Sequence, residues 1–308
     1  MSASSGRHPS RAVIAAAFFC IYVLWGATFL ARQLALRSIP PFMESSLRFL
    51  IAGAALFAFS KARGHRFPPR REALSHAAVG FFLLFGGTGV VSWSQRLVPS
   101  GIASLFVASV PMWMVLVDWA WNRERPHGGI YAGLFLGFCG IAMLARPSAV
   151  TGGINPVGAC TLLMASFSWA LGSVFAKKLP APESDAMVVS IQMLTGGTLL
   201  MLFAFAVGQT HEFSFQRLQP VSLAAMVYLV VFGSIAGFTA YQWLLKMTSP
   251  AIVATHAYVN PLIAVLLGWT VLGEPFSFRI ALSGVLIIIS VALIITASPR
   301  RPPETQGA

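Results

Sequence analysis

The chain has 308 residues, of which 56% are hydrophobic and only 10% are charged, and its formal net charge is +12. A soluble domain of this length carries roughly 25% charged residues, so the composition excludes an ordinary water-soluble fold and indicates apolar surface that faces lipid. The basic excess does not indicate a nucleic-acid partner, because the Lys and Arg residues are spread over the segments between apolar runs.

Apolar runs of about 20 residues, enough for a helix to cross about 30 Å of hydrocarbon, recur along the whole chain. We expect helices rather than barrel strands, because each run is apolar on all sides and about twice the length of a membrane strand. The sequence therefore predicts an all-α membrane protein with ten transmembrane helices. In chain order, the predicted spans are 12–33, 41–60, 74–95, 100–121, 128–146, 156–176, 186–207, 222–245, 250–272 and 277–297.

The distribution of Lys and Arg predicts the orientation of these spans. If both termini lie on one side, that side carries 14 basic residues in its tails and loops and the other side carries 6, Arg32 among them, with Arg48 left inside the second span. Cytoplasmic loops carry the excess of Lys and Arg. We therefore expect residues 1–11 and 298–308 to be cytoplasmic tails of a multi-pass protein in a bacterial-type inner membrane.

The chain repeats itself with opposite polarity. Its first repeat is predicted over residues 12–146 and its second over 156–297, and a shift of 144 residues places Trp25 on Trp169. Because each half has five helices, an odd number, the second half enters the membrane inverted. Inverted repeats predict alternating access to a central cavity between the halves, which needs no cofactor and no metal. A shift of 150 residues pairs Gly87 with Gly237, Trp93 with Trp243, Pro111 with Pro261, Trp119 with Trp269, and Glu124 with Glu274.

Four segments resemble the EamA-type repeats of the bacterial drug/metabolite transporter superfamily, and the resemblance covers essentially the whole chain. They are WGATFLARQLA, PPFMESSLRFLIAG, VPSGIASLFVASVP and SPAIVATHAYVNPLIAVLLG. The nearest likeness is to inner-membrane exporters of amino acids, aromatic metabolites and cationic drugs. The resemblance implies efflux of a small-molecule substrate through the central cavity, and it decides neither the ligand nor the oligomeric state, for which a monomer is plausible.

The two repeat-equivalent tryptophans, Trp25 and Trp169, are the first candidates for substrate binding. They lie near the middle of the first and sixth spans, where the interfacial aromatic belt does not explain them. An indole there offers an apolar face for stacking or cation-π contact with a substrate. Packing between helices is the alternative explanation.

His256 and Asn260 are spaced i, i+4, which places them on one face of the ninth span. We expect this face to point into the bundle, for substrate contact, a hydrogen bond between helices, or, for His256, proton coupling. Their counterparts in the first repeat, Phe106 and Val110, are apolar, so the halves differ where a ligand would be recognised.

Pro111 and Pro261 lie near the middle of their spans, where a proline kinks a helix and frees a backbone carbonyl. Each is predicted to be either a static kink or a hinge used in switching. Tyr241 and Gln242 in the eighth span are further candidates for lining the cavity.

Glu44 and Arg48 are spaced i, i+4 in the second span. They form either a local ion pair near the outer interface or a gate, with Arg48 as a contact for a substrate carboxylate. The sequence shows no acid clearly at the midplane, so passive exchange or facilitated diffusion is at least as good an expectation as proton coupling.

The function expected from the sequence is export of small metabolites, with aromatic amino acids favoured. The alternative within the same class is efflux of drugs or quaternary cations, and the alternative of another class is a receptor or structural membrane protein. An enzyme is not expected, because the chain has no HExxH, GxSxG or Walker sequence and no paired carboxylates.

Overall fold

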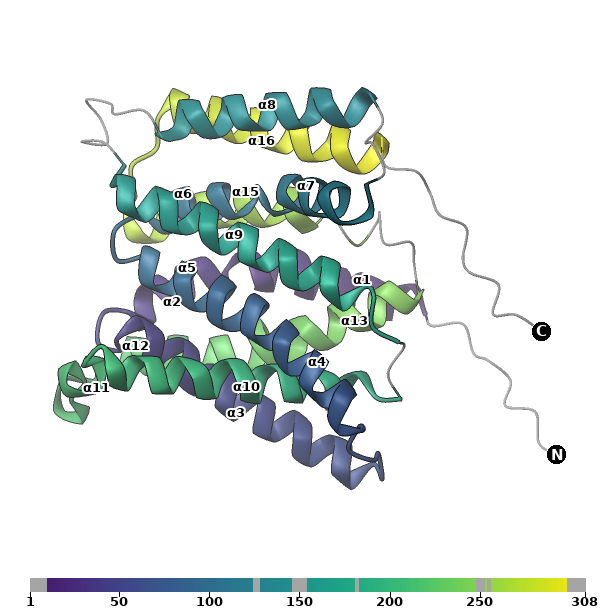
Figure 1. Ribbon diagram of the computed structural model, residues 1–308. Coiled ribbons are helices and arrows are strands. Elements are labelled where there is room, and N and C mark those ends of the chain that lie inside the picture. The colour runs from purple at the N-terminus through teal and green to yellow at the C-terminus, as the bar shows by residue number, and fades with distance from the viewer. Residues whose placement is uncertain are drawn as a thin grey trace, which may run out of the picture.

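The computed structural model describes residues 10–123, 128–145, 154–180, 183–247, 253 and 256–297. The regular secondary structure in this part of the chain is all helical, without a strand. The helices lie side by side with their long axes roughly parallel, so the molecule is a bundle (Figure 1). The prediction of an all-α membrane protein is confirmed.

The first half of the chain supplies five helical segments, three of which change winding or direction along their length. In chain order they are α1 (Arg11–Phe19), η1 (Cys20–Leu24) and α2 (Thr28–Ala35); α3 (Pro41–Ala62); α4 (Arg70–Gly80), η2 (Phe81–Gly89) and α5 (Val90–Ser94); α6 (Ser100–Val107) and α7 (Val110–Asn122); and α8 (Gly128–Ala145).

The second half follows a similar order of helices, with fewer interruptions. It contains α9 (Pro156–Ala176); α10 (Asp185–Ala206); the short α11 (Gln209–Glu212) and η3 (Phe215–Arg217); α12 (Pro220–Tyr228), η4 (Leu229–Ala236) and α13 (Gly237–Met247); α15 (His256–Leu272); and α16 (Phe278–Ala297). The segments η1, η2 and η4 are π-helical, with the wider i→i+5 winding.

Seven helices in the described residues are long and apolar enough to cross a membrane, and an eighth span is formed if α1 with η1 and α2 are counted as one helix bent by 44°. Two further apolar helices, at 128–144 and 259–272, are shorter than a full span. All ten predicted spans coincide with one of these segments, but the count of ten membrane-crossing helices stays a prediction.

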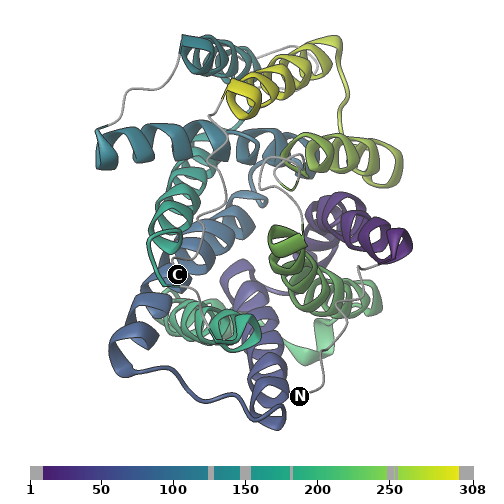
Figure 2. The same cartoon turned by 90° about the vertical axis from the view of Figure 1, so that its right-hand side faces the viewer.

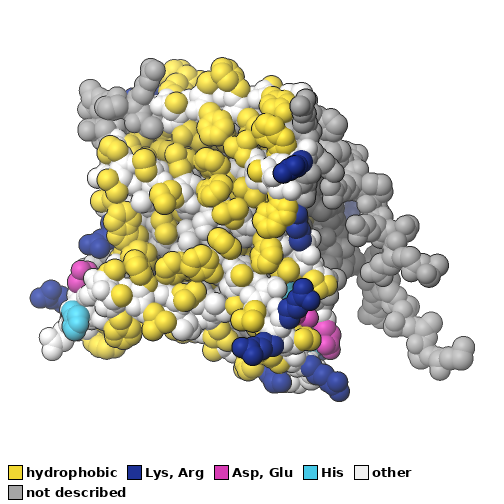
Figure 3. Space-filling model, viewed as in Figure 1, with side chains coloured by type: hydrophobic (Ala, Val, Ile, Leu, Met, Phe, Trp, Pro, Cys, Tyr) yellow, Lys and Arg dark blue, Asp and Glu magenta, His cyan; other side chains and the backbone are white. Residues whose placement is uncertain are grey.

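The apolar surface of the bundle indicates that it lies in lipid. Large apolar side chains such as Phe135, Met164 and Leu202 are 60 to 73% exposed. Figure 3 shows a broad apolar area between two edges where the Lys, Arg, Asp and Glu side chains gather. An exposed apolar area of this extent is stable in lipid and not in water.

The pair α8 and α16 packs together along one side of the bundle in both views (Figures 1 and 2). The small residues along α8 permit this close approach, because a Cβ atom at Gly129 would lie 3.0 Å from Ala297 and one at Gly140 would lie 2.9 Å from Ile287. The pair contacts the rest of the bundle through α6, α7 and α15.

The contact between α3 and α10 is reciprocal. A Cβ atom at Gly53 would lie 3.1 Å from Cγ of Leu194, and one at Gly197 would lie 3.0 Å from Cγ of Leu50. The shift of 144 residues converts the first contact into the second. Two equivalent contacts in which each half contributes the same pair of positions are expected around a two-fold axis. A pseudo-two-fold axis therefore runs between α3 and α10.

The equivalent tryptophans obey the same symmetry. A Cβ atom at Gly237 of α13 would collide with the indole of Trp25, and a Cβ atom at Gly87 of η2 would lie 3.0 Å from the indole of Trp169. Each tryptophan thus packs on the equivalent glycine of the other half. This close approach leaves no room for a Cβ atom at Gly237 and little room at Gly87.

Candidate functional site

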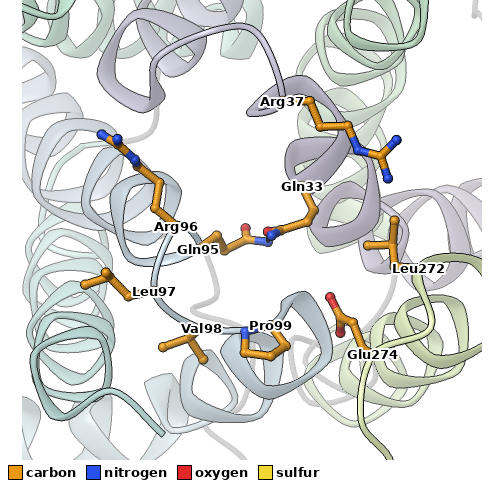
Figure 4. Close-up of a pocket in the computed structure, with 9 residues that line it drawn as sticks. All are labelled: Gln33, Arg37, Gln95, Arg96, Leu97, Val98, Pro99, Leu272 and Glu274. Atoms are coloured by element: carbon orange, nitrogen blue, oxygen red, sulfur yellow. Dashed lines mark hydrogen bonds between the residues drawn. The ribbon is translucent and has the colours of Figure 1, made fainter.

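A cavity of about 400 Å³ opens at the end of the bundle where α2, α5 and α15 finish and α6 begins, which we call the cavity end. This volume is in the range of sites for small molecules. Both halves of the chain contribute to its wall (Figure 4). Its lining residues are Gln33, Arg37, Gln95, Arg96, Leu97, Val98, Pro99, Leu272 and Glu274.

The floor of the cavity is made by Gln95, which is only 1% exposed. Its Nε2 donates to the carbonyl of Phe29 at 3.0 Å and to Oε1 of Gln33 at 3.3 Å, and its Oε1 accepts from Nη1 of Arg32 at 3.1 Å. Figure 4 shows the Gln33 and Gln95 side chains meeting across the middle of the cavity, with Arg37 and Arg96 pointing away from them. Gln95 therefore separates the cavity from Arg32.

A buried charge cluster lies beyond Gln95. Nε of Arg32 is 3.8 Å from Oε2 of Glu44, and this oxygen also accepts hydrogen bonds of 2.8 Å from the hydroxyls of Ser45 and Ser92. Arg32 is 4% exposed and Glu44 is fully buried. A buried ion pair is tolerated when hydrogen bonds satisfy its remaining atoms, which the two serines do for Oε2.

Arg48 adds a second cation to this cluster. Its Nε donates to Oγ of Ser234 in η4 at 2.7 Å, and its guanidinium lies 5.1 Å from the ring centre of Phe49. The side chain is 3% exposed. Two guanidinium groups and one carboxylate are therefore buried together, which leaves a local charge of +1.

These contacts differ from two expectations. Glu44 forms its ion pair with Arg32, and the described ion pairs include none between Glu44 and Arg48. Arg32, which the charge count assigned to an outer loop, is a buried residue of α2 and belongs to the interior. Hydropathy could not distinguish a loop position of Arg32 from a buried one. A basic residue one turn from the end of a span lowers the mean hydropathy equally whichever way its side chain points.

An aromatic cluster forms around Trp25. Its ring centre lies 5.3 Å from that of Phe238 and 5.5 Å from those of both Tyr241 and His256. Its Nε1 donates to the carbonyl of Gly233 at 2.8 Å. The structure thus brings three predicted site residues, Trp25, Tyr241 and His256, into one group.

Trp169 does not join this group, but packs partly buried against the core formed by α3, η2 and α10. Phe106, which is fully buried, belongs to another core cluster, and Val110 is half-buried at the start of α7. Gln242 lies in α13, with its side chain outside the described part of the structure. The predicted candidates are therefore distributed over several places, and none of them lines the cavity.

The polar residues of α15 contact neighbouring backbone. In the amide orientation that satisfies both of its ends, Asn260 donates to the carbonyls of Ile21 and Tyr22 at 2.8 and 2.9 Å, so it connects α15 to η1. Nδ1 of His256 donates to the carbonyl of Val253 at 2.9 Å. The bonds of Asn260 correspond to the expected hydrogen bond between helices, whereas the bond of His256 is a local one that was not among the expectations.

The two equivalent prolines are accommodated differently. Pro261 lies inside the continuous helix α15, whereas Pro111 is the second residue of α7, directly after the break at Ala108 and Ser109. The span with Pro111 is therefore broken, whereas the span with Pro261 continues as one helix. Their role as hinges stays a prediction.

Glu274 joins the two halves at the cavity end. Its Oε1 accepts from the backbone N–H of Ser100 at 2.6 Å and its Oε2 accepts from that of Gly101 at 2.9 Å. A carboxylate at the first turn of a helix satisfies free N–H groups and interacts favourably with the helix dipole. The sequence repeat marked Glu274 as equivalent to Glu124 but gave it no role. Within the described residues, no group of His, Cys, Asp and Glu side chains is arranged to hold a metal ion.

Comparisons with known proteins agree with this arrangement. Residues 12–146 and 156–296 both match the EamA-like transporter family. The uncharacterized inner membrane transporter YedA of Escherichia coli (strain K12) is 36% identical over 280 residues, which are 90% of this chain and 89% of that protein. The probable amino-acid metabolite efflux pump of the same strain is 24% identical, over 87% and 90% of the two chains. A crystal structure with 22% identity superposes with a TM-score of 0.62, over 92% of this chain and 98% of the other, and shows the same fold.

Proposed function

Because the chain belongs to the EamA-like transporter family and is an inner-membrane transporter rather than an enzyme, we propose that it exports small metabolites, with amino acids as its substrates and aromatic amino acids favoured. The aromatic cluster around Trp25 carries this proposal. It combines a residue of the first half with Phe238, Tyr241 and His256 of the second half, at the contact between the halves. Aromatic rings in such a cluster stack favourably on a planar side chain.

Three other observations support the substrate class. The cavity of about 400 Å³ has room for a small metabolite. One relative is named as a probable amino-acid metabolite efflux pump. A local excess of buried positive charge next to the cavity also disfavours a purely cationic ligand, since Arg32 and Arg48 face a single carboxylate.

The mechanism that we propose is alternating access. The reciprocal contacts of Gly53 and Gly197 support a pair of inverted halves that exchange conformations about the pseudo-two-fold axis. The positive-inside rule assigns the cavity end to the outer face of the membrane. In this proposal the structure is the outward-open state, and both chain termini are cytoplasmic.

Transport by purified protein in sealed proteoliposomes tests the proposal. Vesicles loaded with unlabelled L-phenylalanine should accumulate labelled L-phenylalanine by exchange, whereas vesicles without protein should not. Labelled tetraphenylphosphonium is the comparison substrate. Exchange of that cation without exchange of any amino acid would replace the proposal with drug efflux, and a sealed vesicle that exchanges neither would contradict both.

A further inference from the structure

Three atoms of the buried charge cluster have no hydrogen-bond partner. They are Oε1 of Glu44, Nη1 of Arg48 and Nε of Arg32, and each has an exposed surface below 1 Å² among the described residues. Glu44 is fully buried and Arg48 is 3% exposed. Burying a charged atom without a partner is strongly unfavourable, so native structures seldom contain one without a reason.

The two side chains lie on the same face of α3. Glu44 and Arg48 are four residues apart, so their Cα atoms are separated by about 6 Å along the helix axis and lie almost above one another. The other oxygen of Glu44 is occupied by Ser45, Ser92 and Arg32, and Nε of Arg48 is occupied by Ser234. On α3 this leaves free one acceptor, Oε1 of Glu44, and one donor, Nη1 of Arg48, with Nε of Arg32 as a second free donor of the cluster.

This pair of free atoms matches the charged groups of an α-amino acid. A guanidinium N–H is the preferred partner of a carboxylate, and a carboxylate oxygen is a partner for an ammonium group. Glu44 is one carboxylate beside two buried guanidinium groups, so one positive charge of the cluster is left unbalanced. A ligand carboxylate would supply the missing negative charge.

The free pair is adjacent to the aromatic cluster. A Cβ atom at Gly233 would lie 2.9 Å from Nη2 of Arg48, and the carbonyl of the same residue accepts the indole N–H of Trp25. The guanidinium and the indole thus contact one residue of η4 from two sides. A bound molecule with its carboxylate at Arg48 would be able to direct a ring towards Trp25, Tyr241 and His256.

Access to the free pair leads through the cavity floor. Ser92, which donates to Glu44, and Gln95, which bonds Arg32, are one turn apart at the end of α5. Gln95 is also the lining residue that meets Gln33 across the cavity (Figure 4). Displacing one side chain would therefore connect the cavity to Glu44.

We propose that Glu44 and Arg48 form the site that binds the α-ammonium and α-carboxylate groups of the transported amino acid. The proposal deepens the proposed function, on which it rests, by assigning the recognition of the common part of the substrate to two residues of α3. Recognition of the side chain is left to the aromatic cluster. The excess positive charge makes the carboxylate contact the stronger of the two.

Binding to the wild-type protein in detergent tests this site without any substitution. The ligands are L-phenylalanine, 3-phenylpropionate, which lacks the ammonium group, and phenethylamine, which lacks the carboxylate. Losing one hydrogen bond between charged groups weakens binding about tenfold to a hundredfold. We expect L-phenylalanine to bind tightest, 3-phenylpropionate next and phenethylamine weakest. Equal affinity for the three ligands would overturn the proposal.

Substitutions then assign each group to its residue. In Arg48→Gln, phenethylamine should compete with labelled L-phenylalanine as well as unlabelled L-phenylalanine does, because the carboxylate no longer contributes. In Glu44→Gln, 3-phenylpropionate should become the equal competitor. Arg63→Gln and Glu212→Gln remove the same charges from exposed positions, directly after α3 and in α11, and should leave the ranking unchanged.

The outcomes separate this proposal from the proposed function. Binding of L-phenylalanine with an unchanged ranking in both variants would refute the site while amino-acid export stands. Binding of L-leucine but not of L-phenylalanine would keep the site and refute the aromatic preference. If the wild-type protein binds no amino acid, both fail. Should either variant not fold, the ranking by the wild-type protein still decides.

Discussion

The indole N–H of Trp25 donates a hydrogen bond of 2.8 Å to the backbone carbonyl of Gly233. Gly233 lies in η4, where the wider winding changes the usual pairing of backbone groups. The bond therefore joins the first span of the first half to the helix that contains α12, η4 and α13 in the second half. It makes Trp25 a structural contact as well as the centre of the aromatic cluster.

Substituting Trp25 separates these two roles. Trp25→Phe keeps a ring but loses the donor, and should lower the free energy of unfolding by about 0.5 to 1.5 kcal/mol with exchange of L-phenylalanine retained. Trp25→Ala loses the ring as well, which costs about 3 to 5 kcal/mol and should remove most exchange. Thermal unfolding in detergent and exchange in proteoliposomes measure the two effects. Full exchange by an assembled Trp25→Ala protein would contradict a role for the cluster.

The close packing of Trp25 on Gly237 predicts that a methyl group there is not tolerated. Gly237→Ala places a Cβ atom against the indole and should destabilise the protein by about 1 to 3 kcal/mol. Gly128→Ala is the matched control, because no heavy atom lies within 4 Å of that position in α8. The midpoint of thermal unfolding should fall for the first variant only, and equal midpoints would show that the indole moves aside.

Glu274 should stabilise the contact between the halves at the cavity end. Glu274→Gln removes the charge that accepts from Ser100 and Gly101, so we expect a loss of about 1.5 to 3 kcal/mol of unfolding free energy. The control is Glu212→Gln, at an exposed position in α11. A shift in unfolding midpoint no larger than that of the control would show that the two backbone N–H groups are satisfied by water instead.

The floor made by Gln95 should protect Ser92 from reagents in the cavity. In a background without the three native cysteines, Ser92→Cys should react slowly with a membrane-impermeant maleimide, and several-fold faster when combined with Gln95→Ala. Ser94→Cys is the control, because Ser94 is also buried but bonds Thr161 on α9. It should stay protected with and without Gln95→Ala. Equal rates at position 92 in both backgrounds would show that Gln95 is not the barrier.

The proposed orientation predicts the activity of enzyme fusions. The connection between α3 and α4 and the helix α11 lie at opposite ends of the bundle in Figure 1. Alkaline phosphatase, which is active outside the cytoplasm, should be inactive when fused after Gly64 and active when fused after Gly208. The reverse pattern would place the cavity end in the cytoplasm and make the structure an inward-open state.

Hydropathy was enough to predict where the helices lie. The internal repeat was enough to predict that Trp25 and Trp169 occupy equivalent positions in the two halves. Both depend on patterns over many residues, which persist through local variation. The π-helical segments and the break after Val107 could not be predicted this way, because each depends on the packing of a few side chains against another helix. Hydropathy records the composition of a span and not its winding.

The site was predicted less well for a related reason. Tyr241 and His256 do meet Trp25, yet Arg32 and Gln95 were missed since each looks like a residue at the end of a span. Their burial follows from contacts with residues more than 60 positions away, such as that between Gln95 and Arg32. Neither hydropathy nor the internal repeat of a single sequence shows which distant residues will be in contact.

The wide windings of η2 and η4 fix the rotational phase of the helices that follow them. An α-helix turns about 100° per residue, so straightening a π-helical turn into α-helix would rotate the segment beyond it by about that angle. Beyond η2 lie Ser92 and Gln95 of the cavity floor, and beyond η4 lie Phe238 and Tyr241 of the aromatic cluster. Converting one π-helical turn in either helix into α-helix is thus enough to rotate the site residues beyond it away from their present partners.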